Sequence, residues 1–244
     1  MTYRNNGKKN TEEMYDAIAS EYDSVYYQKK IENIILAEDM ALQKMIPYYG
    51  GEVLDLGCGT GYFLDLFHVS DKSTYFGLDI SQNMIDVARK NHEGFNFFRA
   101  DALSFSTYSL LLQKRTLTEP RHYDLVVSLF SIPDYCGLDV VGKAYDFLVK
   151  GGTFVSTFIN KTGGYEKIFC LEENGFDYKP QAFTYEEIQS AFKKAGYGVF
   201  YISGFSHNAL SNKEDPVDMC DLILRNKDWL LDDCKYYFAM AKKT

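Results

Sequence analysis

The sequence predicts an α/β protein, in which a largely parallel sheet is flanked by helices. Two observations support this fold class. Short apolar runs alternate with amphipathic segments along the chain, and a glycine-rich turn joins the first apolar run to the segment that follows it. With 244 residues, of which 46% are hydrophobic and 25% charged, the chain has enough material for the core of one domain.

Each element follows from its local pattern. The apolar runs predict strands at 53–56, 73–79, 95–99, 123–129, 153–159, 199–202 and 236–241. The amphipathic segments between them predict helices at 60–67, 82–90, 142–149 and 185–195. Gly196 is expected to close the last of these helices, because glycine readily takes the left-handed conformation at a helix C-terminus. The Lys150-Gly151-Gly152 sequence is expected to form a turn before the fifth strand.

Three stretches fall outside this alternation. The first 50 residues have helical periodicity at 11–23 and 31–46, and predict an N-terminal helical cap on a single domain spanning 1–244. Residues 160–183 and 204–234 are long connections, and such connections are usually functional lids or disordered. We therefore expect two substrate-side insertions, while the pattern in 105–122 leaves its structure open.

Charge and composition exclude several classes of partner. The net charge of −8 argues against nucleic acid, whose phosphates are bound by Lys and Arg. No apolar run approaches the roughly 20 residues that span a bilayer, and the first ten residues lack the apolar stretch of a signal peptide. The five cysteines form no C-x-x-C pair and suggest reduced thiols. We expect a cytoplasmic monomer or homodimer that binds no membrane.

The glycine-rich turn is the most specific motif, and reads Asp55-Leu56-Gly57-Cys58-Gly59-Thr60-Gly61. A dinucleotide-binding fingerprint needs its third glycine one place later, where this sequence has Tyr62. The turn also lacks the G-K-[ST] of a phosphate-binding P-loop. Its glycines allow a close backbone approach, and the acidic residue at its start suits a ligand that carries a positive charge.

Two further acids point to a nucleoside. Asp79 ends the second strand, where a carboxylate can accept hydrogen bonds from both hydroxyls of a ribose. Asp101 follows the third strand and could accept a hydrogen bond from the amine of adenine. Ile80 and Met84 offer apolar faces for the base.

These residues resemble the class I S-adenosylmethionine-dependent methyltransferases, in particular their small-molecule branch. The resemblance is carried first by the glycine turn with its preceding strand and by Gly77-Leu78-Asp79-Ile80-Ser81-Gln82-Asn83-Met84. It continues through 123–128, 148–153 and 183–197, and the segment 15–23 is similar to the opening helix of that branch.

The resemblance implies a Rossmann-like sheet of seven strands, with six parallel and the last inserted antiparallel. It places S-adenosylmethionine over the carboxyl ends of strands one to four. The residues it assigns to the cofactor are Tyr15 and Tyr22 as a cover, Asp55 at the amino group, Gly57, Gly59 and Gly61 in the loop, Asp79 at the ribose, Ile80, Met84, Asp101 and Ala102 at the adenine, and Ser128 or Leu129 at the methyl end.

The expected reaction is methyl transfer to nitrogen or oxygen of a small-molecule acceptor by in-line displacement, which leaves S-adenosylhomocysteine. Alignment and a desolvated pocket are the main requirements, and a general base helps only when the acceptor must lose a proton. Candidates near the substrate are His207 in the second insertion, and Asp134 and Tyr135 beyond the fourth strand. We expect no metal, since Ser128 stands where an acid could serve as a ligand.

Two other functions remain open. The chain could be a non-catalytic module that binds the cofactor or a partner, with the amphipathic segment 219–231 as a partner helix. A nicotinamide-dependent dehydrogenase is disfavoured by the glycine spacing.

Overall fold

The computed structural model describes residues 3–23, 29–48, 50–104, 122–163, 180–207, 215–225 and 234–244. Within these residues, seven strands form one sheet in the order β3-β2-β1-β4-β5-β7-β6. The strands are β1 (Val53–Leu56), β2 (Tyr75–Asp79), β3 (Asn96–Arg99), β4 (Tyr123–Ser128), β5 (Leu148–Ile159), β6 (Val199–His207) and β7 (Cys234–Lys242). β7 pairs antiparallel with both β5 and β6, while the pairs from β3 to β5 are parallel. The predicted fold class is confirmed.

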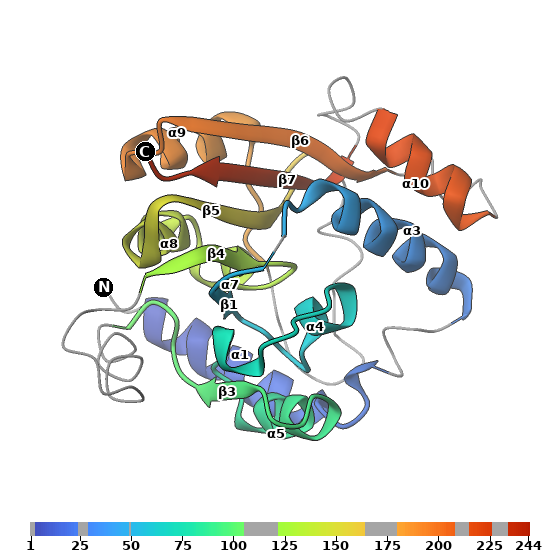
Figure 1. The fold of residues 1–244 in the computed structure, drawn as a ribbon, viewed down its shortest axis with the longest axis vertical. Coiled ribbons are helices and arrows are strands. Elements are labelled where there is room, and N and C mark those ends of the chain that lie inside the picture. Colours follow the sequence, from blue (N-terminus) through green and yellow to red (C-terminus); the bar gives the residue numbers. More distant parts are fainter. Residues whose placement is uncertain are drawn as a thin grey trace.

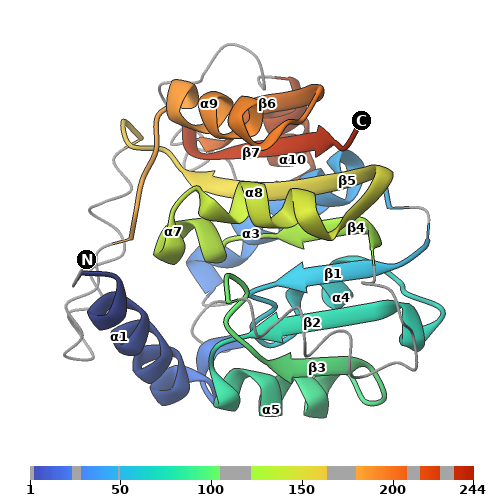
Figure 2. The ribbon, with the colours of Figure 1, turned by 90° about the vertical axis from the view of Figure 1, so that its left-hand side faces the viewer.

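Helices cover both faces of the sheet (Figures 1 and 2). They are α1 (Tyr3–Ile18), α3 (Lys29–Met45), α4 (Tyr62–Leu66), α5 (Gln82–Asn91), α7 (Ile132–Cys136), α8 (Asp139–Phe147), α9 (Tyr185–Ala195) and α10 (Pro216–Arg225). Figure 2 shows α7, α8 and α9 in front of the sheet, with α3, α4 and α10 behind it. Two buried clusters match these layers: one contains Leu42, Phe63 and Ile223, and the other contains Val141 and Phe192.

Local signals fix the helix ends. Ser81 caps α5 by accepting a hydrogen bond from the Met84 backbone N–H over 3.1 Å. Thr184 and Glu187 form a capping box at the start of α9, and Gly196 ends that helix with φ at 93°. These caps satisfy backbone groups that have no partner inside the helix.

The two helices of the expected N-terminal cap pack in different places. α1 contacts α5 and α7, whereas α3 contacts α10 and α4. In Figure 2, α1 lies at the end of the sheet near α7, and α3 lies behind the strands. Of these two helices, α1 is therefore the one that lies near the carboxyl ends of β1 and β2.

Several element bounds differ from those expected. β5 begins at Leu148, so it includes the Lys150-Gly151-Gly152 sequence expected as a turn. α8 begins at Asp139, three residues earlier than expected, and α7 is a short helix that periodicity did not indicate. β6 extends to His207, so the second insertion begins as part of the sheet. Most of 105–122 lies outside the described residues.

Candidate active site

A cavity opens at the carboxyl ends of β1 to β4, with about 670 Å³ of free space including its mouth. This is the edge at which ligands bind in open parallel sheets, beside the point where the strand order reverses. The cavity is lined by Thr11, Tyr15, Tyr22, Gly57, Gly59, Asp79, Ile80, Met84, Ala100, Asp101, Ala102, Phe130, Ser131, Ile132, Tyr135 and Cys136. Nine of the predicted cofactor residues are in this lining, together with Tyr135.

The glycine loop leaves room in the cavity at one position. Gly57 and Gly59 have φ of 74° and 54°, values in the left-handed region that favours glycine. A Cβ on Gly57 would stand 1.7 Å from Ser131 Oγ, so the loop packs tightly against the segment after β4. A Cβ on Gly59 would meet no atom within 4 Å. Gly59 therefore presents bare backbone to a space that a ligand can fill.

Asp79 links this loop to the end of β2. Its Oδ2 accepts the Gly59 backbone N–H over 3.0 Å, and its Oδ1 accepts the Ser81 N–H over 2.9 Å. Burial raises the pKa of Asp79 to about 6 against the backbone hydrogen bonds that lower it, and the neighbouring Asp16 raises it further. The carboxylate is partly buried on the cavity wall, in the place expected for a ribose partner.

The wall beyond Asp79 is mostly apolar. Met84 and Ala102 are buried, and Ile80 is partly buried beside them in the lining. Asp101 lies at the end of this wall, where its Oδ1 accepts the Leu103 N–H over 3.0 Å. This arrangement suits a flat heterocycle that has one polar edge.

Three tyrosine rings cover the opposite side. The Tyr15 ring of α1 lies 6.1 Å from that of Tyr22 and 5.5 Å from that of Tyr135, edge to face in both pairs. The Tyr15 and Tyr135 hydroxyls also form a hydrogen bond. Asp16 fixes α1 in this position, since its Oδ1 accepts from Ser81 Oγ over 2.5 Å.

Four predicted cofactor residues lie outside the lining. Asp55 is 4% exposed, and its carboxylate accepts the Tyr75 hydroxyl over 2.8 Å inside the core, so it does not reach the cavity. Gly61 is the N-cap residue of α4, and a Cβ on it would lie 2.3 Å from the His92 ring. Ser128 and Leu129 are buried and do not line the cavity, whose lining includes the next residue, Phe130.

Of the residues predicted to take part in catalysis, some line the cavity and others do not. Tyr135 lines the cavity, whereas Asp134, on the same short helix, is buried and outside the lining. Burial raises the pKa of the Asp134 carboxyl well above its usual range, which disfavours the ionised form that a base requires. His207 ends β6, and its side chain lies outside the described residues.

Sequence reasoning missed six lining residues, which are Thr11, Ala100, Phe130, Ser131, Ile132 and Cys136. Four of them follow β4, where the sequence predicted Ser128, Leu129, Asp134 and Tyr135 as site residues. A continuous apolar run could have indicated this. The last four residues of β4 and Leu129 are all buried, so the first residue able to face the cavity comes after Leu129.

The charge of the lining residues limits the chemical class of ligand that the cavity can bind. Asp79 and Asp101 are acidic, and no Lys, Arg or His is among the described lining residues. Such a wall disfavours a pyrophosphate and favours a cation. Among the described residues, no group of three or more His, Cys, Asp or Glu could hold a metal ion. No helix in the described part of the chain is long and apolar enough to cross a membrane.

Comparisons with known proteins find similarity to methyltransferases. Residues 53–152 match the family model described as "Methyltransferase domain". An uncharacterized protein of Methanocaldococcus jannaschii is 25% identical over 227 residues, covering 83% of this chain and 82% of its own. The demethylmenaquinone methyltransferase of Lactococcus lactis is 25% identical over 220 residues, covering 78% of this chain and 82% of its own.

A solved structure has the same fold over nearly the full length. It is an S-adenosylmethionine-dependent methyltransferase of Thermotoga maritima, described as a possible histamine N-methyltransferase. Its TM-score is 0.66 at 16% identity, covering 96% of this chain and 99% of that one. The chain therefore has the fold of an S-adenosylmethionine-dependent methyltransferase, and its residues 53–152 match the model of a methyltransferase domain.

Proposed function

We propose that this chain transfers the methyl group of S-adenosylmethionine to nitrogen or oxygen of a small-molecule acceptor. The observation that carries the proposal is the composition of the cavity wall. Two carboxylates, a bare glycine position and tyrosine rings surround it, and its described residues include no basic side chain. A sulfonium nucleoside needs this combination, because its positive charge is stabilised by acids and by aromatic faces.

Each part of the wall has a role. Asp79 accepts hydrogen bonds from the ribose hydroxyls, and Asp101 and Ala102 flank the adenine. The open backbone at Gly59 admits the methionine part. When bound, S-adenosylmethionine supplies a methyl group already activated by its sulfonium. Tyr15, Tyr22 and Tyr135 then exclude water and limit the approach of the acceptor to one line.

A small acceptor agrees with the names of two similar proteins. The Lactococcus lactis relative is named for demethylmenaquinone, and the Thermotoga maritima structure is described in terms of histamine. Both compounds are small organic molecules. Because both proteins have low sequence identity to this chain, their names do not indicate which atom of the acceptor is methylated.

Calorimetry with S-adenosylhomocysteine, S-adenosylmethionine and NAD tests the cofactor. We expect the first two to bind and NAD to bind more weakly, since the acidic wall repels a pyrophosphate. Tighter binding of NAD, or no binding of either S-adenosyl compound, would contradict the proposal. Release of S-adenosylhomocysteine is then followed with panels of small amines, phenols and carboxylic acids. A chain that binds the cofactor but turns over with none of them acts as a binding module instead.

A further inference from the structure

The helix α1 reaches from one side of the cavity to the other. It contacts α5, which follows β2, and α7, which follows β4. Figure 2 shows α1 beside the carboxyl ends of the strands, and it contributes Thr11 and Tyr15 to the cavity lining. The attachments of α1 on these two sides therefore determine how easily the cavity opens.

On the α5 side, α1 is attached by polar groups. Asp16 Oδ1 accepts the Ser81 hydroxyl over 2.5 Å, and the Asn83 side-chain amide donates to the Asp16 carbonyl over 2.8 Å. Glu12 also forms an ion pair with Arg99, at the end of β3. This side of α1 thus has several attachments.

On the α7 side, α1 is attached through two tyrosines. The hydroxyls of Tyr15 and Tyr135 form a hydrogen bond, and the two rings meet edge to face with their centroids 5.5 Å apart. Both side chains line the cavity, so this bond joins α1 to α7 at the cavity wall. We call the pair the tyrosine bridge.

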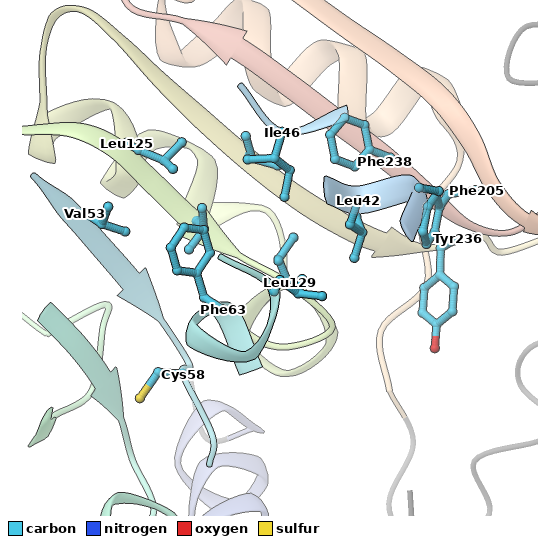
Figure 3. Close-up of a cluster of buried hydrophobic side chains, with 14 of the residues drawn as sticks. Leu42, Ile46, Val53, Cys58, Phe63, Leu125, Leu129, Phe205, Tyr236 and Phe238 are labelled. Atoms are coloured by element: carbon cyan, nitrogen blue, oxygen red, sulfur yellow. The ribbon is translucent and has the colours of Figure 1, made fainter. Parts of the chain in front are cut away.

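The helix that carries Tyr135 is too short to hold it in place alone. α7 has five residues, and a single turn of helix is unstable without packing. The core fixes the segment before α7, because Leu129 belongs to the buried cluster that contains Leu42 (Figure 3). The Phe130 backbone N–H also donates to Thr157 Oγ1 over 2.6 Å. The C-terminal side of α7 needs another support.

Gln181 supplies that support. Its backbone N–H donates to the Asp134 carbonyl over 2.8 Å, and its side-chain amide donates to the Tyr135 carbonyl over 3.0 Å. Both acceptors are in the last turn of α7, where carbonyls have no partner inside the helix. Gln181 lies near the end of the 160–183 connection, so the end of this connection holds α7 in position.

We propose that the tyrosine bridge is the closure that retains S-adenosylmethionine in the cavity, and that Gln181 is a positioning residue that keeps Tyr135 within reach of Tyr15. The bridge must break before the cofactor or its product leaves. The inference rests on the proposed function and adds the contact that controls exchange of its cofactor.

The first test removes each hydroxyl of the bridge and keeps its ring. Surface plasmon resonance on the immobilised full chain measures the binding and dissociation rates of S-adenosylhomocysteine. We expect Tyr15→Phe and Tyr135→Phe each to raise the dissociation rate about fivefold, the effect of one lost hydrogen bond. The double variant should raise it no further, because both changes break the same bond. Tyr145→Phe, on α8 and outside the lining, should leave the rates unchanged.

The second test asks whether Gln181 acts through the bridge. Gln181→Met keeps the length of the side chain and removes the amide donor, so it should also raise the dissociation rate about fivefold. In the Tyr15→Phe background it should add nothing, since the bridge is already broken. Gln189→Met, on α9 and outside the lining, is the matched control.

The outcomes separate this closure from the proposed function. Absence of S-adenosylhomocysteine binding would contradict both. If that compound binds, unchanged dissociation in the tyrosine variants, or additive effects of the two, would contradict the bridge. An effect of Gln181→Met that persists in the Tyr15→Phe background would contradict the positioning role. The thermal midpoint is measured alongside, and a midpoint that falls in step with faster dissociation would mean that general loosening sets the rate.

Discussion

The Gly59 backbone N–H donates to Asp79 Oδ2 over 3.0 Å, so the carboxylate proposed to bind ribose also fixes the glycine loop. The loop follows β1 and the acid ends β2, and the two strands are neighbours in the sheet. The Asp79 side chain therefore both fixes the conformation of the glycine loop and supplies negative charge to the cavity wall. A ligand that hydrogen-bonds Asp79 meets an acid whose orientation is already set, which lowers the entropy lost on binding.

Replacing this carboxylate should weaken cofactor binding. For Asp79→Ala we expect a loss of about 1.5–3 kcal/mol in the binding free energy of S-adenosylhomocysteine, the range for a charge-assisted hydrogen bond. Calorimetry measures it, with Asp86→Ala on the exposed face of α5 as the control. The thermal midpoint should fall too, since Gly59 and Ser81 lose their acceptor. Unchanged affinity would mean that the ribose lies elsewhere.

Two glycines of the loop should respond differently to the same substitution. Gly57→Ala places a Cβ 1.7 Å from Ser131 Oγ and should destabilise the fold. Gly59→Ala meets no protein atom within 4 Å, so its main effect should be a loss of cofactor affinity, and Gly59→Val should block the cradle. Gly50→Ala, also at positive φ and in open space, measures the backbone strain alone. Equal affinity for S-adenosylhomocysteine in wild type and Gly59→Val would show that nothing binds against this loop.

The fold and most of the cavity lining at the ends of β1 to β3 were predictable because they depend on local signals. The glycine spacing, the acid after β2 and the acid after β3 each sit at a strand end, and parallel strands bring those ends to one edge. Asp55 was misplaced because the motif fixes its position on the strand but not the face to which it points. Only the packing of Tyr75 shows that its carboxylate turns into the core.

The surroundings of Phe130 could not be predicted in the same way. Tyr62, Phe130 and Tyr236 come from α4, the turn after β4, and β7, and no sequence pattern joins them. The contact between the Tyr62 hydroxyl and Asp39 likewise joins residues that are 23 positions apart in the sequence. Such contacts depend on tertiary packing, which spacing within the sequence does not encode.

Stability should depend on pH through Asp55. Burial raises the native pKa of Asp55 to about 7, against 3.8 for the unperturbed group, so the native state retains a proton that the unfolded chain loses. The contribution to stability is complete below about pH 4 and is lost as the pH rises toward 7, at about 1.4 kcal/mol for each pKa unit. Asp55→Asn retains an acceptor for Tyr75 without this titration. Urea unfolding at pH 5 and pH 8 should therefore show the variant gaining on wild type at the higher pH, and an equal difference at both would contradict the assignment.

The attachment of α1 should control how fast the cofactor leaves. Asp16 Oδ1 accepts from Ser81 Oγ over 2.5 Å and from the Asn83 N–H over 3.1 Å, and Tyr15 beside it lies on the cavity. Asp16→Ala removes both bonds at the start of α5, which frees the tyrosine cover while the lining stays intact. We expect S-adenosylhomocysteine to dissociate about tenfold faster, with a smaller change in association, because the cover must open before release. Stopped-flow displacement measures both rates. Asp86→Ala, an acid on the exposed face of the same α5 helix, should leave them unchanged, and equal effects of the two variants would mean that lost charge, not the anchoring of α1, sets the rate.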